Sequence, residues 1–409
     1  MAALSPLAPD RFPELPPIPG VRLAAYAAGI RYTGRNDMML AELMPGSTIA
    51  GVFTRSLTAG PPVLWCQACL PGGRVRAIVV NSGNANVFTG RAGKAAVEMT
   101  AAAAATLFRC DPTEVFISST GVIGEPPPVQ KIVEALPKIA PSLAPEAWEP
   151  AARAIMTTDT FPKGATATAT IDGTSVRLNG FAKGSGMIGP DMATMLAYVF
   201  TDAALPASVL QPLLAAATVR SFNSITVDGD TSTSDTVLFC ATQQARHAPV
   251  SSPADRRLGS FRRALDRVMI DLAQQIARDG EGAEKFVTIE VTGAASARAA
   301  RRIGLTIGNS PLVKTAISAG DANWGRIVMA VGKAGEKADR DRLSISIGGV
   351  QIAAQGGPVP GYDEGPVTEH MKGRDIHIDV DIGIGRGRAT VWTCDLTHGY
   401  VDINGSYRS

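Results

Sequence analysis

The sequence predicts a mixed α/β fold (α+β mixed), because segments typical of strands and segments typical of helices alternate along the chain. Runs rich in Val and Ile are followed by Ala-dense runs or by runs whose apolar residues recur with a helical period. At 409 residues the chain exceeds one ordinary domain, and at roughly 150 residues per domain it suggests two or three packed units. No internal repeat is apparent, and no segment marks a domain boundary.

In the first half of the chain, strand-like and helix-like segments alternate after a proline-rich N-terminal segment. Residues 74–81 are a β-branched run that leads into the turn-forming segment 81–86, NSGNAN, and the Ala-dense run 93–108 contains few helix breakers. Prolines at 126–128 stand where the first turn of a helix tolerates them. The expected order is strand 47–55, strand 74–81, helix 93–108, strand 113–118, helix 127–136, and strands 165–171, 175–181, 195–201 and 236–241.

The second half opens with the clearest helix of the sequence. From Phe261 apolar residues recur at Leu265, Val268, Leu272 and Ile276, and Gly280 ends the helix. The glycine-rich segment 383–387, between two strand-like runs, predicts a hairpin turn rather than a phosphate cradle. The remaining expected elements are strand 286–291, helix 324–331, strand 343–353, surface loop 356–365, and strands 376–382 and 389–394.

Composition excludes several classes of protein. Hydrophobic residues make up 45% of the chain and charged residues 19%, which rules out disorder over most of its length. The formal charge of +2 is too small for a general phosphate-binding surface, so we expect no nucleic-acid partner. Prolines together with Gln or clustered Gly interrupt the charge-free stretches, so we expect no membrane span, and the proline-rich N-terminal segment lacks the pattern of a secretory signal. Five scattered cysteines favour a cytoplasmic location.

Cys66 and Cys69 have CxxC spacing, which a zinc half-site or a redox pair would share. There is no second CxxC, and the four histidines stand apart in the sequence, so we expect an ordinary loop pair and no metal.

The most unusual segment is GFAKGSGMIGPDMATML at 180–196, where four glycines and a proline precede an abrupt apolar run. Thr194 stands where this constrained loop enters a buried strand. The pattern alone favours an ordinary loop and strand start over a catalytic role. A threonine can nevertheless be a nucleophile when a base lies close, and its own α-amine can be that base once the preceding peptide bond is cut. That amine has an intrinsic pKa of about 7.7 to 8.0, so part of it is neutral near pH 7.

Three further polar segments are candidates for chemistry. SSTG at 118–121 follows a predicted strand, where backbone N–H groups could face an oxyanion, and a plain Ser/Thr turn fits equally well. DGDTSTSD at 228–235 lacks EF-hand spacing, which favours a hydrogen-bonded turn over a cation site. DGEG at 279–282 caps the amphipathic helix, and Glu281 between two glycines is either a solvated carboxylate or a ligand contact.

Many ordered motifs of this chain, taken together, resemble the bifunctional ornithine acetyltransferase family, also called glutamate N-acetyltransferase, of arginine biosynthesis. The resemblance spans nearly the whole chain. Its motifs are GVRLA at 20–24 with AGIR at 28–31, VNSGNAN at 80–86, STGVIG at 119–124, IMTTDT at 155–160, KGSGM at 183–187, ATML at 193–196, TVDGDTST at 226–233, DGEG at 279–282, NWGR at 323–326 and IN at 403–404.

The resemblance implies a two-lobed α/β fold and a proenzyme that cleaves itself between Ala193 and Thr194. An α chain of residues 1–193 and a β chain of residues 194–409 would result, and their usual minimal assembly is an α2β2 heterotetramer. Thr194 would then be an N-terminal nucleophile that takes acetyl from N-acetylornithine and passes it to glutamate in ping-pong fashion. No cofactor is implied, and acetyl-CoA is a candidate second acyl donor.

Carried over by position, the family's oxyanion-hole pair corresponds to Thr120 and Gly121. Its substrate-binding positions correspond to Thr157, Lys183, Thr194, Glu281, Asn404 and Ser409. We expect Lys183 to meet an α-carboxylate and Glu281 to meet the ornithine ammonium.

The sequence departs from the family pattern in three places. Asp191 stands where Asn is common, SAGDA occupies 318–322, and the tail reads NGSYRS at 404–409. Asp191 bears on processing, and the tail bears on specificity.

Two alternatives use the same residues. A self-processing hydrolase of the N-terminal-nucleophile type would pass the acyl group to water, and an uncleaved binding protein would keep the fold without the chemistry. Dependence on an acceptor separates the transferase from the hydrolase, and the chain mass separates both from the binding protein.

Overall fold

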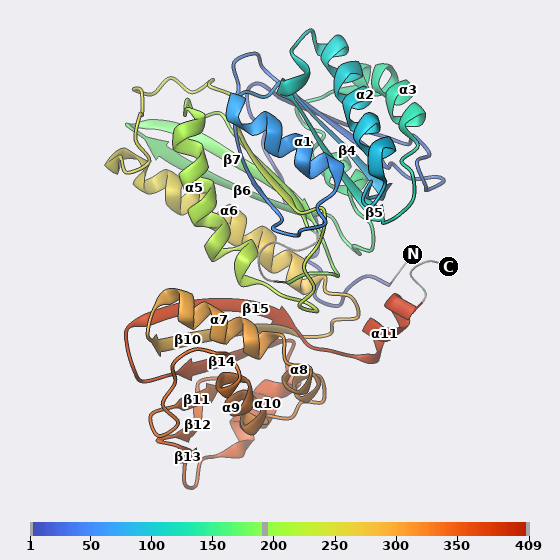
Figure 1. Cartoon of the computed structure of the whole chain (residues 1–409). Coiled ribbons are helices and arrows are strands. Elements are labelled where there is room, and N and C mark those ends of the chain that lie inside the picture. The colour runs from blue at the N-terminus through green and yellow to red at the C-terminus, as the bar shows by residue number, and fades with distance from the viewer. Residues whose placement is uncertain (1–2, 190–194, 406–409) are drawn as a thin grey trace.

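Three β-sheets organise the described residues of the chain, and Figure 1 shows these sheets divided between two lobes. The structure is a computed structural model that describes residues 3–189 and 195–405. Two sheets with α1–α6 form the N-terminal lobe, the third sheet with α7–α10 forms the C-terminal lobe, and α11 lies beside them. The expected mixed α/β, two-lobed fold is confirmed.

The first sheet of the N-terminal lobe has the order β1-β2-β4-β5, with β4 and β5 parallel and the other pairs antiparallel. Its outer face is covered by α2 and α3, whose apolar residues Val97, Ala101 and Leu136 pack on it. The elements are β1 Val21–Tyr26, β2 Met38–Leu43, β4 Ala77–Asn84, α2 Gly90–Phe108, β5 Val115–Val122 and α3 Val129–Ile139.

The second sheet has the order β3-β9-β8-β7-β6, with β8 and β9 parallel. Helices α5 and α6 cover its outer face through residues such as Leu214 and Leu272. The elements are β3 Thr48–Phe53, β6 Lys163–Ile171, β7 Thr174–Lys183, β8 Leu196–Thr201, α5 Ala207–Arg220, β9 Thr236–Ala241 and α6 Gly259–Arg278.

The inner faces of these two sheets pack on each other and on α1 (Pro61–Cys69) and α4 (Trp148–Ala154). The Trp148 ring lies edge-on to Phe200, with centroids 5.7 Å apart. On β8, Tyr198 and Phe200 face this inner core while Val199 faces α5 and α6, so both faces of the strand are buried. This explains the continuous apolar run of β8, since a strand buried on both faces has no polar side.

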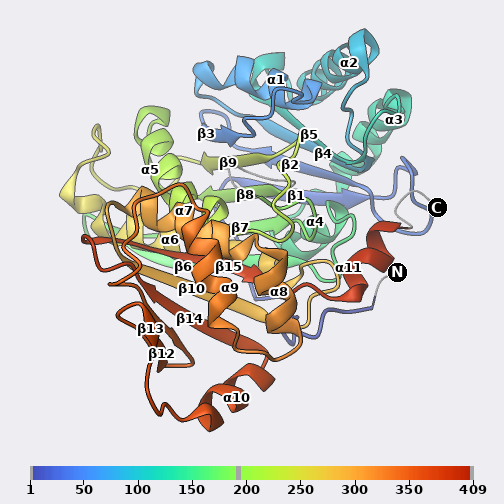
Figure 2. The same cartoon turned by 60° about the horizontal axis from the view of Figure 1, so that its bottom comes forward.

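The C-terminal lobe is a six-stranded sheet of order β13-β12-β11-β14-β10-β15, with α7, α8, α9 and α10 on one face. Figure 2 shows α7 and α9 in front of β10 and β15, with α10 at the bottom of the view. The elements are β10 Phe286–Ala294, α7 Ala297–Gly308, α8 Pro311–Ser318, α9 Trp324–Gly332, β11 Ser344–Ile347, β12 Val350–Ala354, β13 Gly357–Pro358, α10 Glu364–Lys372, β14 Asp375–Asp381, β15 Gly387–Cys394 and α11 His398–Gly405.

Several predictions of local structure were wrong. Segment 81–84 continues β4 instead of turning, because parallel pairing with β5 extends to Asn84. The single strand expected at 343–353 is a hairpin of β11 and β12. Segment 383–387 is a crossover rather than a hairpin turn, because β10 lies between β14 and β15. Cys66 and Cys69 lie on α1 rather than in a loop.

Candidate active site

A pocket of about 220 Å³ opens where the ends of β5 and β7 meet the segment that precedes β9. The structure brings six of the predicted site residues into its lining, from five separate parts of the chain. These residues are Thr120, Gly121, Thr157, Lys183, Glu281 and Asn404. Ala85, Val122, Ile123 and Met187 supply apolar wall beside them. One small cavity thus joins apolar surface with an ammonium and a carboxylate, as ligand pockets commonly do.

Thr120 and Gly121 lie within β5 rather than in a turn after it. Gly121 has φ +133°, and a Cβ there would stand 2.3 Å from the carbonyl carbon of Gly83 on the neighbouring β4. Only glycine permits this approach, because it lacks Cβ and tolerates positive φ. The backbone at this wall is therefore held by close packing of two strands.

Lys183 ends β7 and is buried, with 2% of its surface exposed. Burial lowers the pKa of its ammonium, and the negative charges of Asp159, Asp235 and Glu281 oppose that effect. Lys163 adds to the lowering. Because Lys183 lines the pocket, its ammonium is suited to bind a substrate carboxylate through charge-assisted hydrogen bonds.

Glu281 follows α6, and its backbone N–H donates to Ser185 O at 2.9 Å. Its Oε2 accepts a 2.7 Å hydrogen bond from Asn404 Nδ2 on α11. A Cβ on Gly186 would lie 2.4 Å from the Glu281 carboxyl carbon, so this glycine makes room for the carboxylate. The loop after β7 and the C-terminal helix together orient Glu281 at the pocket.

Thr157 is fixed through its backbone, whose N–H donates to Asp159 Oδ2 at 3.0 Å. The segment TSTSD at 231–235, for which a turn was favoured over a cation site, contributes Ser232, Thr233 and Ser234 to the lining. The expected hydrogen-bonded turn lies just before these residues, where Asp230 N donates to Asp228 Oδ1.

Asp228 also accepts from the backbone N–H groups of Met187 and Ile188 at 2.7 and 2.9 Å, and so anchors the loop after β7. Sequence reasoning did not predict this role, although the aspartate-rich motif was the signal that could have indicated it.

Three of the predicted site residues, Ala193, Thr194 and Ser409, lie outside the described residues. Met195, the residue after Thr194, donates its backbone N–H to Asp235 Oδ1 at 2.8 Å. Asp235 is fully buried, and burial raises the pKa of its carboxyl well above the usual value. Sequence reasoning assigned Asp235 to the turn of segment 228–235 and did not predict its contact with Met195, because a buried carboxyl has no pattern of its own at the start of an apolar strand.

Two other groups of potential ligands lie outside the pocket lining. All five cysteines are free, and burial raises the pKa of Cys66 to about 12 and that of Cys69 to about 11, so neither thiol is poised to ionise.

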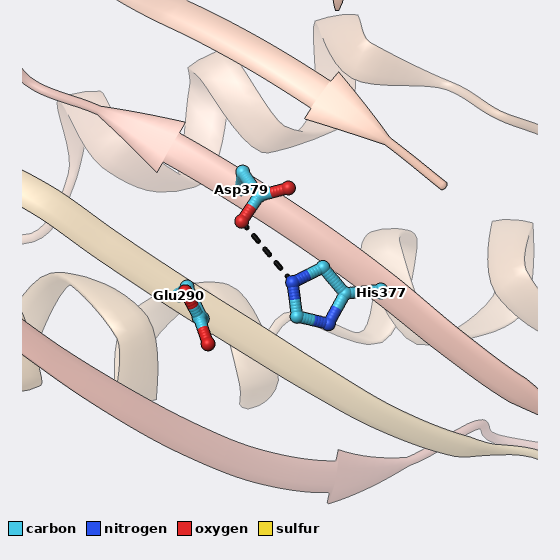
Figure 3. A group of neighbouring side chains, drawn as sticks. All are labelled: Glu290, His377 and Asp379. Atoms are coloured by element: carbon cyan, nitrogen blue, oxygen red, sulfur yellow. Dashed lines mark hydrogen bonds and ion pairs between the residues drawn. The ribbon is translucent and has the colours of Figure 1, made fainter. Parts of the chain in front are cut away.

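On the sheet of the C-terminal lobe, Glu290, His377 and Asp379 place ligand atoms within 4.8 Å of one another. Figure 3 shows these three side chains on two neighbouring strands. His377 is thus not isolated, contrary to the sequence-based expectation, because β10 and β14 are adjacent. The three side chains are partly or fully exposed and come from register positions that commonly carry polar residues on an open sheet face.

No helix within residues 3–189 and 195–405 is long and apolar enough to cross a membrane.

Comparison with known proteins places these motifs in one family. The ArgJ family model matches residues 22–409. The arginine biosynthesis bifunctional protein ArgJ of Gluconobacter oxydans is 59% identical over 99% of this chain and 96% of its own length. The protein of the same name from Brucella suis is 55% identical over the full length of both chains.

A crystal structure of the Bacillus halodurans protein argJ is 42% identical and covers 50% of this chain and 96% of its own, with a TM-score of 0.48. Because the family model spans nearly the whole sequence and these relatives align over almost their entire length, the chain belongs to the ArgJ family.

Proposed function

We propose that this protein transfers the acetyl group of N-acetylornithine to glutamate, in arginine biosynthesis, through an acetyl ester on Thr194. The observation that carries the proposal is the meeting of Thr120, Gly121, Lys183 and Glu281 in one pocket. Lys183 and Glu281 offer opposite charges to the two charged ends of an amino acid, and Thr120 with Gly121 faces the same space. The names of the two relatives, bifunctional proteins of arginine biosynthesis, support the substrate class.

The chemistry takes two steps of the same kind. In the first, the Thr194 hydroxyl adds to the acetyl carbonyl carbon, its proton passes to the Thr194 α-amine, and the C–N bond to ornithine breaks as ornithine takes up a proton. In the second, the amine of glutamate attacks the ester and releases the threonine hydroxyl. Each step forms a tetrahedral oxyanion, which Thr120 and Gly121 would stabilise.

The free α-amine of Thr194 requires cleavage of the bond from Ala193 to Thr194. We infer that the resulting chains, 1–193 and 194–409, stay together, because β7 and β8 are paired from Leu178–Thr201 to Lys183–Leu196 on either side of the break. Strand β3 of the first chain also pairs with β9 of the second. The division therefore runs through the second sheet rather than between the lobes.

The first experiment is the intact mass of the denatured protein beside that of a Thr194→Ala variant. Scaling 42.5 kDa by 193/409 and 216/409 predicts fragments of about 20 and 22 kDa, with the variant uncut. A single uncut chain in an active preparation would contradict the free-amine mechanism.

The hydrolase alternative is tested by the acceptor. Ornithine release from N-acetylornithine rises steeply with glutamate if the protein is a transferase and barely changes if water is the acceptor. Release that is independent of glutamate would replace the proposed transfer by hydrolysis.

We further propose that the protein needs no cofactor and that acetyl-CoA is a second acyl donor. A cavity of about 1200 Å³ adjoins the pocket and shares Thr158 and Glu281 with it, which leaves room for a donor larger than an acetylated amino acid. Lys372 and Arg374 lie in its lining. Formation of N-acetylglutamate from acetyl-CoA and glutamate by the purified protein tests this, and its absence would make the enzyme monofunctional.

We also propose an α2β2 assembly in the cytoplasm. Five free thiols are typical of a reducing compartment. The assembly is tested by sedimentation, where a mass near that of one chain pair would contradict it.

A further inference from the structure

A buried ion triad lies among the segments that form the pocket. Lys163 Nζ contacts Asp159 Oδ1 at 2.7 Å and Asp279 Oδ2 at 2.6 Å, and all three side chains are fully buried. Two carboxylates thus share one ammonium. Removing charges from water costs several kcal/mol per ion, so a buried triad is weak grounds for stability and suggests a different role.

Asp159 joins two walls of the pocket. Its Oδ2 accepts from the backbone N–H of Thr157 at 3.0 Å, and its Oδ1 accepts from that of Gly184 at 2.6 Å. Thr157 lines one wall, and Lys183, the neighbour of Gly184, lines the other. The two oxygens of one carboxylate therefore hold the two walls at a set separation.

Asp279 extends the connection to a third wall. Its Oδ2 accepts from Thr160 N at 2.9 Å as well as from Lys163, and it stands two residues before Glu281. Through Lys163 the aspartate that holds Thr157 and Gly184 is linked to the segment that carries Glu281.

The charge of Asp159 also acts on Lys183. Burial opposes ionisation of Asp159, but the ammonium charges of Lys163 and Lys183, together with the hydrogen bonds from Gly184 N and Lys163, outweigh it and hold the pKa of Asp159 below its usual value. In return, the Asp159 carboxylate raises the pKa of Lys183, and Asp235 and Glu281 act in the same direction. Burial and the positive charge of Lys163 lower the pKa of Lys183. These four ionisable groups act on the pKa of Lys183, and burial raises the pKa of one of them, Asp235, well above its usual value.

We propose that Asp159 is a positioning residue for substrate binding, whose carboxylate holds the Thr157 and Lys183 walls together and is itself held by Lys163. The inference rests on the proposed function, because its readout uses the proposed substrates. It goes beyond that function, since Asp159 acts through Thr157, Lys183 and Lys163 and lies outside the pocket lining.

The test compares Asp159→Asn with the parent protein. The amide cannot accept at both positions, so KM for N-acetylornithine and for glutamate should rise about tenfold or more, with a smaller change in kcat. Loss of the negative charge should also move the alkaline limb of the kcat/KM profile to lower pH, because Lys183 then loses its proton more easily. A role in stability alone would move neither quantity.

Asp202→Asn is the matched control. Asp202 is also buried, and it accepts a backbone hydrogen bond from Arg177 N at 2.8 Å. It follows the C-terminal end of β8, whereas Met195 precedes the N-terminal end of that strand. Its KM values and alkaline limb should equal those of the parent. Equal values in Asp159→Asn and the parent would overturn the proposal.

Asp159→Glu serves if Asp159→Asn does not fold. It keeps the charge but lengthens the side chain, so KM should rise while the alkaline limb stays in place; an unchanged KM overturns the proposal. A parent without turnover disproves the proposed function separately. Calorimetric dissociation constants for N-acetylornithine and glutamate then replace KM, and equal constants in parent and variant overturn the positioning role.

Discussion

Asn404 Nδ2 donates a 2.7 Å hydrogen bond to Glu281 Oε2, and the same amide group donates to Tyr400 O at 3.0 Å within α11. The C-terminal helix is thereby tied to the loop that follows α6, 123 residues earlier in the chain. Both residues line the pocket. A neutral donor on one oxygen steers the carboxylate without cancelling its charge, so Glu281 can still attract a cation.

Glu281→Gln should raise KM for N-acetylornithine by roughly ten- to a hundredfold, because a hydrogen bond to a charged group is worth about 1.5–3 kcal/mol. Steady-state kinetics measure the change. Glu284→Gln is the control, since Glu284 is exposed and lines only the larger cavity. An unchanged KM in Glu281→Gln would show that Glu281 does not meet the ornithine ammonium.

Gly186→Ala should raise the same KM with little effect on the midpoint of thermal unfolding. The added Cβ would stand 2.4 Å from the Glu281 carboxyl carbon, and the flexible glutamate side chain would swing away. Gly332→Ala, at the end of α9, meets nothing within 4 Å and should leave KM alone. If both variants bind N-acetylornithine equally well, the position of the Glu281 carboxylate does not matter for binding.

Gly121→Ala should lower the free energy of unfolding by about 1–3 kcal/mol and abolish acetyl transfer, because backbone must move to admit a Cβ at φ +133°. Gly124→Ala carries a similar conformational cost at φ +86° but meets nothing within 4 Å. It should therefore be the milder variant. Urea unfolding and the transfer assay compare the two, and full activity in Gly121→Ala would remove this wall from the mechanism.

The cysteines of α1 should resist alkylation in the folded protein. Burial raises the pKa of Cys66 to about 12 and that of Cys69 to about 11, so at pH 8 almost no thiolate exists at either. Mass spectrometry after iodoacetamide treatment should show both unmodified in the native protein and modified after denaturation. Rapid native modification of either residue would indicate an accessible, reactive pair.

Motifs such as Gly121 and the apolar period of α6 could be recognised in the sequence because each depends on the conformation of residues close together in the chain. Gly121 needs positive φ and close approach to β4, and the apolar period of α6 needs a buried face; both leave a mark in consecutive residues. Residues whose role depends on distant partners leave no such mark. Nothing in the sequence around Lys163 marks it as special. Only the fold brings it between Asp159 and Asp279, and Asp279 lies 116 residues further along the chain.

By itself the sequence determined the class of fold, most of the strands, the longest helices and the family resemblance, and through that resemblance it indicated six of the residues that line the pocket. Tertiary structure alone decided that β10 separates β14 from β15, that Cys66 and Cys69 lie buried on a helix, and that an ion triad joins three walls of the pocket. The physical reason is range. Helical period, strand alternation and glycine conformation act between near neighbours in sequence, whereas strand order and buried charge depend on segments that meet only after folding.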